Sequence, residues 1–241
     1  MRPETSTLSA PNTISAGPAL AWGWRATFKN WLTWVVLTAV GLAAVVLSFL
    51  VLPVTTPLVI AALILPLGSV NVLRQARQPR FRLGDVRATE YQETLLTSLF
   101  VVAACVAVVT AWSTVITGGL ADLFVAPTTN QGAPFYQTAL FWLLVGGILG
   151  INLLTPLLSM VMLYAADAMS VWEAARPGYR AAKRNYGPLL LISLAATALN
   201  LVGLALAVVG LLITLPVGAL AFGHAYLQVS SQPLPEKATS K

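Results

Sequence analysis

Long apolar runs alternate with short polar segments along most of the chain. The runs cover residues 32–52, 57–73, 95–116 and 137–163, and a further block from 188 to 229 contains no Lys, Arg, Asp or Glu. A transmembrane helix needs about 20 consecutive apolar residues, so this block is long enough for two spans, at 188–205 and 208–229. The pattern predicts an all-α, polytopic membrane protein whose six transmembrane helices form three hairpins.

The composition excludes an ordinary soluble domain. Hydrophobic residues make up 57% of the chain and charged residues 9%, whereas soluble domains carry about 25% charged residues. The mean hydropathy is +0.79. Residues 1–16 and 230–241 are polar, so we predict disordered tails on either side of a single six-helix membrane domain at 17–229. No cleavage pattern of small residues follows the first run, so we expect it to remain as the first span.

The positive charges predict the orientation. All 14 Lys and Arg residues fall in the two tails with their flanking segments, between the second and third spans, and between the fourth and fifth. The alternate segments, 53–56, 117–136 and the turn near Asn200, contain none. Positive residues are retained on the cytoplasmic side, so both termini are predicted to be cytoplasmic, in the inner membrane of a bacterium. The net charge of +6 then faces anionic lipid headgroups rather than nucleic acid.

Two segments of the chain share one pattern of residue types: glycine, an aromatic residue, Arg-Ala, a basic residue, asparagine and a closing aromatic residue. Residues 23–31 read GWRATFKNW and residues 178–186 read GYRAAKRNY, and a shorter Arg-Ala step occurs at Arg87 before the middle hairpin. The second helix of each predicted hairpin contains a proline: Pro66, Pro156 and Pro216. The pattern predicts parallel internal repeats related by an axis along the membrane normal, with possible hinges at the prolines. The alternative is that only the first and third units are related.

The repeated segments are predicted to form amphipathic helices on the cytoplasmic surface. The first places aromatic residues on one stripe (Leu20, Trp24, Phe28, Trp31), and the second places Trp172, Ala175, Tyr179, Ala182 and Tyr186 on one face. Ser170 and Glu173 have capping-box spacing, and Pro177 predicts a kink or two short helices. We expect Arg25, Lys29, Arg180, Lys183 and Arg184 to contact anionic headgroups or a membrane-protein partner. Simple anchoring and orientation in the membrane is the other role.

The chain offers little for catalysis or cofactor binding. It has one His and one Cys, and Cys105 in mid-span is expected to behave as a small apolar residue. His224, near the cytoplasmic end of the last span, lacks the partners of a metal site, so we expect packing rather than a proton relay. We therefore predict no enzyme activity, no metal and no cofactor.

Asn152 is the most informative polar residue inside a span. It lies four residues before Pro156, and Gly146 and Gly150 on the same helix have the G-x-x-x-G spacing that permits close helix approach. Proline frees the carbonyl group four residues earlier, which weakens the helix there. We expect a tight contact between helices at this point; a ligand site is the alternative.

Residues 167–188, DAMSVWEAARPGYRAAKRNYGP, and the later LPVGALAFGHAYLQV resemble the YciC-like bacterial six-helix membrane proteins. That group is related to the membrane domain attached to some glycerophosphodiester phosphodiesterases, whose acidic metal site has no counterpart here. The resemblance covers about residues 17–229 and implies an architecture, with no catalytic residues to transfer. We predict a non-enzymatic scaffold or regulatory subunit of a bacterial envelope complex. The alternative is a small transporter or lipid-handling protein that uses a cavity between the hairpins.

Overall fold

The computed structural model describes residues 13–52, 55–78, 81–86, 91–115, 139–167, 170–206, 209–230 and 232, and these residues form helices and short connections. Six helical segments within them are long and apolar enough to cross a membrane: Trp31–Val51, Thr56–Arg77, Thr94–Val115, Leu144–Ala166, Tyr186–Ala205 and Leu211–Val229. Each overlaps one of the six predicted spans. The sequence-based prediction of an all-α, multi-pass membrane protein is confirmed at this level.

Five of the spans are continuous helices: α2 (Trp31–Val51), α5 (Tyr91–Val115), α7 (Ala139–Ala166), α9 (Tyr186–Ala205) and α10 (Leu211–Val229). The second span is composite, with α3 (Thr56–Val59), the π-helical turn η2 (Ile60–Ile64) and α4 (Leu65–Arg77). Pro66 has no backbone N–H and cannot continue the α-helical ladder, and the turn before it widens. The Ser98 hydroxyl of α5 donates to the Ala61 carbonyl of this widened turn, so the irregular backbone also joins α5 to the second span.

Two further helices precede spans: α1 (Ala16–Lys29) before α2, and α8 (Val171–Arg184) before α9. The predicted capping box is confirmed, because Ser170 caps α8 and exchanges hydrogen bonds with Glu173. Of the two outcomes predicted at Pro177, a kink or two short helices, the second is wrong, since α8 is one continuous helix through it. Proline removes one donor from the ladder, and the residue four positions earlier, Glu173, is exposed, so water can satisfy its carbonyl group.

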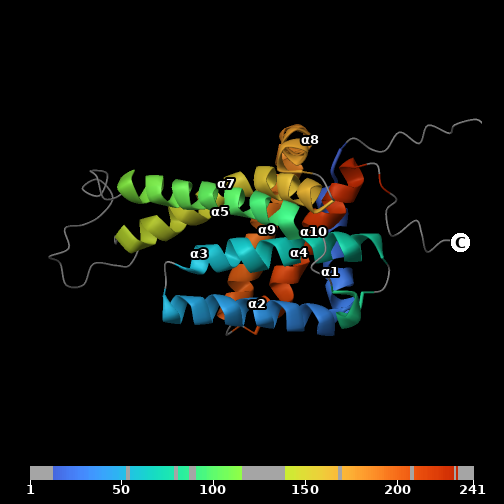
Figure 1. Cartoon of the computed structure of the whole chain (residues 1–241), viewed down its shortest axis with the longest axis horizontal. Helices are drawn as coiled ribbons and strands as arrows, with labels where there is room; N and C mark the ends of the chain where they lie inside the picture. The colour runs from blue at the N-terminus through green and yellow to red at the C-terminus, as the bar shows by residue number, and fades with distance from the viewer. Residues whose placement is uncertain are drawn as a thin grey trace, which may run out of the picture.

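Figure 1 shows how the spans are arranged. The α5 and α7 helices run together along one edge, α2 lies along the opposite edge, and α3 to α4 lie between them. The α10 helix is central, because it contacts α1, α9, α4, α2 and α7. In its most apolar stretch 72% of the residues are buried, compared with 6% for α2. The α2 helix therefore presents most of its surface to lipid, whereas α10 forms the core of the bundle.

Small residues allow the neighbouring helices to approach α10 closely. A Cβ atom at Gly218 would come within 2.8 Å of the Ala196 Cβ in α9, and one at Gly223 within 2.5 Å of the Val72 Cγ1 in α4. Lipid tails are as apolar as the helix surfaces, so spans associate through such close packing rather than by hydrophobic exclusion. These contacts explain why α10 is rich in glycine and alanine.

The predicted ends of the domain need adjustment. Residues 1–16 were predicted as a tail, but Ile14 is buried and α1 already begins at Ala16. Beyond α10, Gln232 hydrogen-bonds to Asp167. The predicted outer loop at 117–136 and the Arg-Ala step at Arg87 lie outside the described residues.

Candidate functional site: the basic end of the bundle

Small residues form the faces by which α1 and α8 pack against spans. Gly23 of α1 lies on α10, where a Cβ atom would come within 2.5 Å of the Val217 carbonyl oxygen. Gly178 of α8 lies on α7 in the same way, with a Cβ position 2.7 Å from the Val161 Cα. The fully buried neighbours on these faces are Ala19 in α1, and Ala174 and Ala182 in α8. Both helices are therefore held by close backbone contact.

The aromatic residues predicted on these helices remain largely outside the packing. Trp24, Phe28 and Trp31 are about half exposed, and Trp172 is 81% exposed. Tyr186 is different, since its hydroxyl donates to the Leu153 carbonyl of α7 at 2.8 Å. Trp and Tyr rings are favoured at the membrane–water interface. Their exposure leaves the rings on the outer surface of α1 and α8, beside the faces that pack on α10 and α7.

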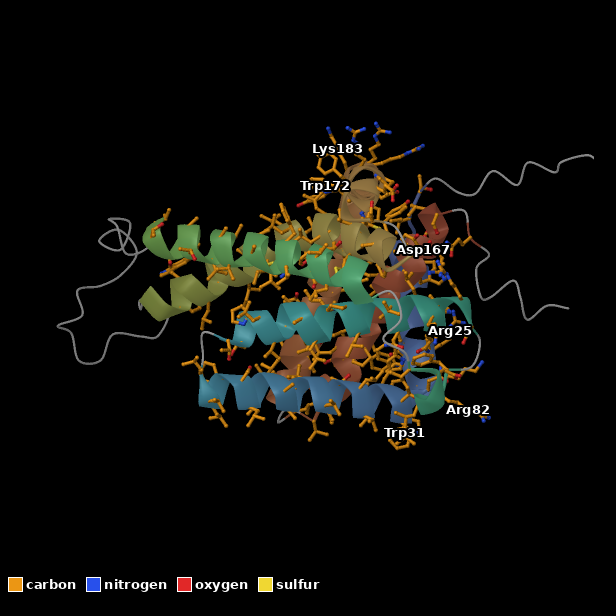
Figure 2. The ribbon with its side chains drawn as sticks, viewed as in Figure 1. Arg25, Trp31, Arg82, Asp167, Trp172 and Lys183 are labelled. Carbon is orange, nitrogen blue, oxygen red and sulfur yellow. The ribbon has the colours of Figure 1, made fainter. Side chains whose placement is uncertain are left out.

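The five basic residues singled out from the sequence are all exposed, but the structure separates them into two groups. Arg25 and Lys29 lie on α1, whereas Arg180, Lys183 and Arg184 lie on α8. Figure 2 shows Lys183 and Trp172 on α8, well away from Arg25 on α1. The structure therefore presents two basic and aromatic surfaces rather than one cluster.

An asparagine forms each junction between one of these helices and the span that follows. Asn30 (φ −123°, ψ 34°) and Asn185 (φ −116°, ψ 28°) have nearly the same backbone conformation. The Asn30 side-chain oxygen accepts from the Phe81 N–H at 3.3 Å, and that of Asn185 accepts from the Ile14 N–H at 3.0 Å. Each asparagine thus binds the backbone of a segment that is distant in sequence. The repeated sequence contained both asparagines, but their partners were not predictable.

The Asn30 contact fixes a corner where α1, α2 and the segment after α4 meet. The Phe81 ring stacks on Trp34 with a centroid separation of 6.0 Å. Trp34 donates its indole N–H to the Gln75 side-chain oxygen, and the Gln75 amide donates to the Ala26 carbonyl at 2.9 Å. Gln75 is almost fully buried, so these bonds satisfy polar groups that would otherwise be costly inside the protein.

A second polar cluster joins the ends of α4, α7 and α10. Asp167 forms an ion pair with Arg77 and accepts hydrogen bonds from the Tyr226 hydroxyl at 2.6 Å and the Gln232 amide at 2.9 Å. The Tyr226 ring meets Tyr164 edge to face at 4.9 Å. The sequence analysis placed Asp167 at the membrane boundary but did not identify this network. Its members come from segments 90 or 59 residues apart, so no local pattern reveals it.

Asn152 makes a contact between α7 and α9, as the tight-packing interpretation predicted. Its side-chain oxygen accepts from the Ser193 hydroxyl at 2.7 Å and the Thr197 hydroxyl at 2.9 Å. The neighbouring glycines serve a different partner: the space beside Gly146 is filled by the Trp112 ring and that beside Gly150 by Val108. These glycines thus accommodate side chains of α5 rather than another backbone.

His224 lies in the contact between α1 and α10. Its ring stacks on Trp22 at a centroid distance of 5.1 Å, and its Nδ1 lies 3.0 Å from the Gln228 amide nitrogen. The Gln228 oxygen accepts from the Ser15 N–H at 2.8 Å, so the amide nitrogen faces the histidine and donates to Nδ1. In neutral His224 the ring proton is therefore on Nε2. His224 is nearly fully buried, which gives it a structural position.

The three prolines on the second helices of the predicted hairpins are all buried. Pro156 and Pro216 lie inside continuous helices, and Pro66 follows the π-helical turn. The part of the chain that the structure describes contains no group of three or more His, Cys, Asp or Glu residues that could hold a metal ion. Comparisons with protein-family models, curated proteins and solved structures gave no match.

Proposed function

We propose that this protein is a non-enzymatic scaffold or regulatory subunit of a bacterial envelope complex. In this proposal three parallel hairpins surround an approximate threefold axis, and the basic end faces the cytoplasm. The aromatic and basic surfaces of α1 and α8 contact anionic lipid headgroups and a membrane-protein partner. The resemblance to YciC-like membrane proteins belongs to the same proposal, because both rest on the architecture.

The equivalence of α1 and α8 supports the internal repeat. Both helices contain 14 residues, and their boundaries lie 155 positions apart at each end. Gly23 and Gly178 make the close contacts at that same offset, as do the junction residues Asn30 and Asn185. Equivalent residues at a constant offset in equivalent conformations favour a duplicated unit.

The contacts also favour a cyclic order of the three hairpins. The α1 helix, before the first hairpin, packs on α10 of the third, and α8, before the third, packs on α7 of the second. In the opposite direction round the ring, Asn30 binds Phe81 on the way to the second hairpin, and Asn185 binds Ile14 on the way to the first. A ring of units with the same neighbour relation is what an axis along the membrane normal produces.

The observation that carries the proposal is that α1 and α8 expose aromatic and basic side chains beside the faces that pack on α10 and α7. Trp172 is the most exposed large hydrophobic residue on either helix, and the exposed basic residues lie on the same two helices. Exposed apolar rings bordered by polar residues are typical of surfaces that bind a partner or a membrane.

Transport through a central cavity is less well supported. The centre of the bundle holds α10, and the oxygen of Asn152, which lies within a span, already accepts two hydrogen bonds. A transport site requires polar groups that a substrate can reach. Two hollows at the surface are lined by residues of α1, α2, α10 and the 81–83 segment. Asn152 lines neither of them.

The test is native mass spectrometry of the tagged protein extracted from its own membrane in a mild detergent. We expect a stoichiometric protein partner with the wild type, and loss of that partner in the α8 variant Trp172→Ala/Arg176→Gln/Arg180→Gln. The matched control is Leu47→Ala/Leu50→Ala on the exposed face of α2, which should retain the partner. Absence of a partner from the wild type, or equal retention by both variants, would refute the scaffold proposal.

A further inference from the structure

A hollow of about 410 Å³ lies at the corner fixed by Asn30 and Phe81. It is lined by Lys29, Asn30, Trp31, Leu32, Thr33, Phe81, Arg82 and Leu83. Two of these residues are cations, from segments 53 positions apart, and none is acidic. Figure 2 shows Trp31 and Arg82 at the same corner of the molecule. The hollow therefore concentrates positive charge at the end of a span.

The two cations are held differently. Lys29 ends α1 directly before the junction at Asn30. Arg82 follows Phe81, whose N–H is bound by Asn30 and whose carbonyl accepts from Thr33. The acidic neighbour Asp85 accepts from the Arg82 backbone N–H at 2.8 Å and offsets part of the local charge. With Lys29, Arg82 and Asp85 counted, the corner remains positive.

An apolar hollow of about 290 Å³ lies next to the basic one. Thr27, Phe28, Trp31, Val35 and Ile213 line it. Trp31 lines both hollows, so a basic compartment and an apolar one meet at this residue. The apolar compartment lies between α1, the first turns of α2 and the start of α10.

We infer that this pair of hollows binds one anionic phospholipid of the surrounding bilayer. The phosphate lies in the basic compartment with Lys29 and Arg82, and the upper part of an acyl chain lies in the apolar compartment against Phe28 and Val35. Trp31 marks the boundary between headgroup and chain, as tryptophan does at membrane interfaces. A soluble anion would use only the first compartment, whereas a phospholipid matches both in charge and polarity. The inference needs the basic end at the interface, as in the proposed function, but no protein partner.

The test uses native mass spectrometry of detergent-purified protein titrated with phosphatidylglycerol or with phosphatidylcholine of the same chains. Each cation near an anionic headgroup contributes about fivefold to binding. The variant Lys29→Gln/Arg82→Gln should therefore bind phosphatidylglycerol about 30-fold more weakly, with a smaller loss for phosphatidylcholine, whose choline cation offsets the charge of its phosphate. Phe28→Ser should weaken the binding of both lipids, because it removes an apolar wall without changing the charge.

The matched control is Lys237→Gln/Lys241→Gln, which removes the same amount of positive charge from the C-terminal segment. It should leave phosphatidylglycerol binding within about twofold of the wild type. Equal losses in the control and the Lys29/Arg82 variant would show nonspecific attraction and overturn the inference. Glycerol phosphate that competes as well as the whole lipid, with no effect of Phe28→Ser, would indicate a soluble-anion site and also overturn it. Lipid binding that follows the expected pattern without a co-purifying protein would refute the scaffold proposal alone.

Discussion

Replacement of Gly23 by alanine tests whether α1 is held on α10 by direct backbone contact. The new Cβ would lie 2.5 Å from the Val217 carbonyl oxygen and 3.0 Å from the Ala221 nitrogen, whereas ordinary contact begins at 3.4 Å. Both neighbours are backbone atoms and cannot rotate away. The two helices must therefore separate by about 0.9 Å, and overpacking of this kind costs about 1–3 kcal/mol.

The matched control is Gly17→Ala in the same helix, where a Cβ would have nothing within 4 Å. Alanine stabilises a helix relative to glycine by about 1 kcal/mol, and this gain applies to both variants. The difference between their free energies of unfolding therefore isolates the packing cost, and we expect Gly23→Ala to be less stable than Gly17→Ala by about 1–3 kcal/mol.

The free energy of unfolding would be measured by titration with dodecyl sulfate in mixed micelles, followed by circular dichroism. Gly178→Ala, whose Cβ would lie 2.7 Å from the Val161 Cα, should behave as Gly23→Ala does. If Gly23→Ala is as stable as Gly17→Ala, the close approach of α1 and α10 is refuted, and with it the argument that glycine is required at this offset in both units.

Three further predictions concern the interior and the orientation. Asn152→Ala should lower the free energy of unfolding by about 1–2 kcal/mol, because two hydroxyl groups of α9 lose their acceptor; unchanged stability would contradict the contact. Asp167→Asn and Tyr226→Phe should each cost about 1 kcal/mol in the same assay, and the double variant should cost less than the sum, since the side chains share one hydrogen bond. In a Cys105→Ala background, a cysteine in place of Arg176 should react with a membrane-impermeant maleimide only after the cytoplasmic membrane is opened; labelling in intact cells would reverse the proposed orientation.

The spans and the start of α8 were predictable because local sequence determines them. An apolar run of about 20 residues is favoured in the hydrocarbon core of a bilayer. The Ser170–Glu173 capping box satisfies backbone donors within a single turn of the helix. Pro177 does not divide α8 into two helices, because the cost of a proline depends on its surroundings. Near the exposed Glu173 carbonyl, water replaces the lost bond, and the contacts of α8 with α7 keep the helix continuous.

The candidate site was less predictable, because distant contacts build it. The sequence identified Lys29 as exposed and basic, but the partner cation Arg82 is placed beside it by Asn30, which binds Phe81 across 51 positions. Likewise, the aromatic stripe identified α1 as an amphipathic helix. It did not show that Gly23 faces the bundle and that Trp24 is exposed. Helical periodicity shows which residues share a face; only the packing partner decides which face is buried.

The contact between α1 and α10 also constrains how the protein is made. Gly23 is synthesised roughly 190 residues before Val217, which at about 5–20 residues per second corresponds to roughly 10–40 s. Through that interval the small-residue face of α1 has no span to pack against, and for most of it Ile14 has no Asn185 to bind. The exposed rings of Trp24 and Phe28 can hold the helix on the lipid surface meanwhile. The first helix to leave the ribosome is then among the last to reach its final position, and the insertion of α10 closes the ring.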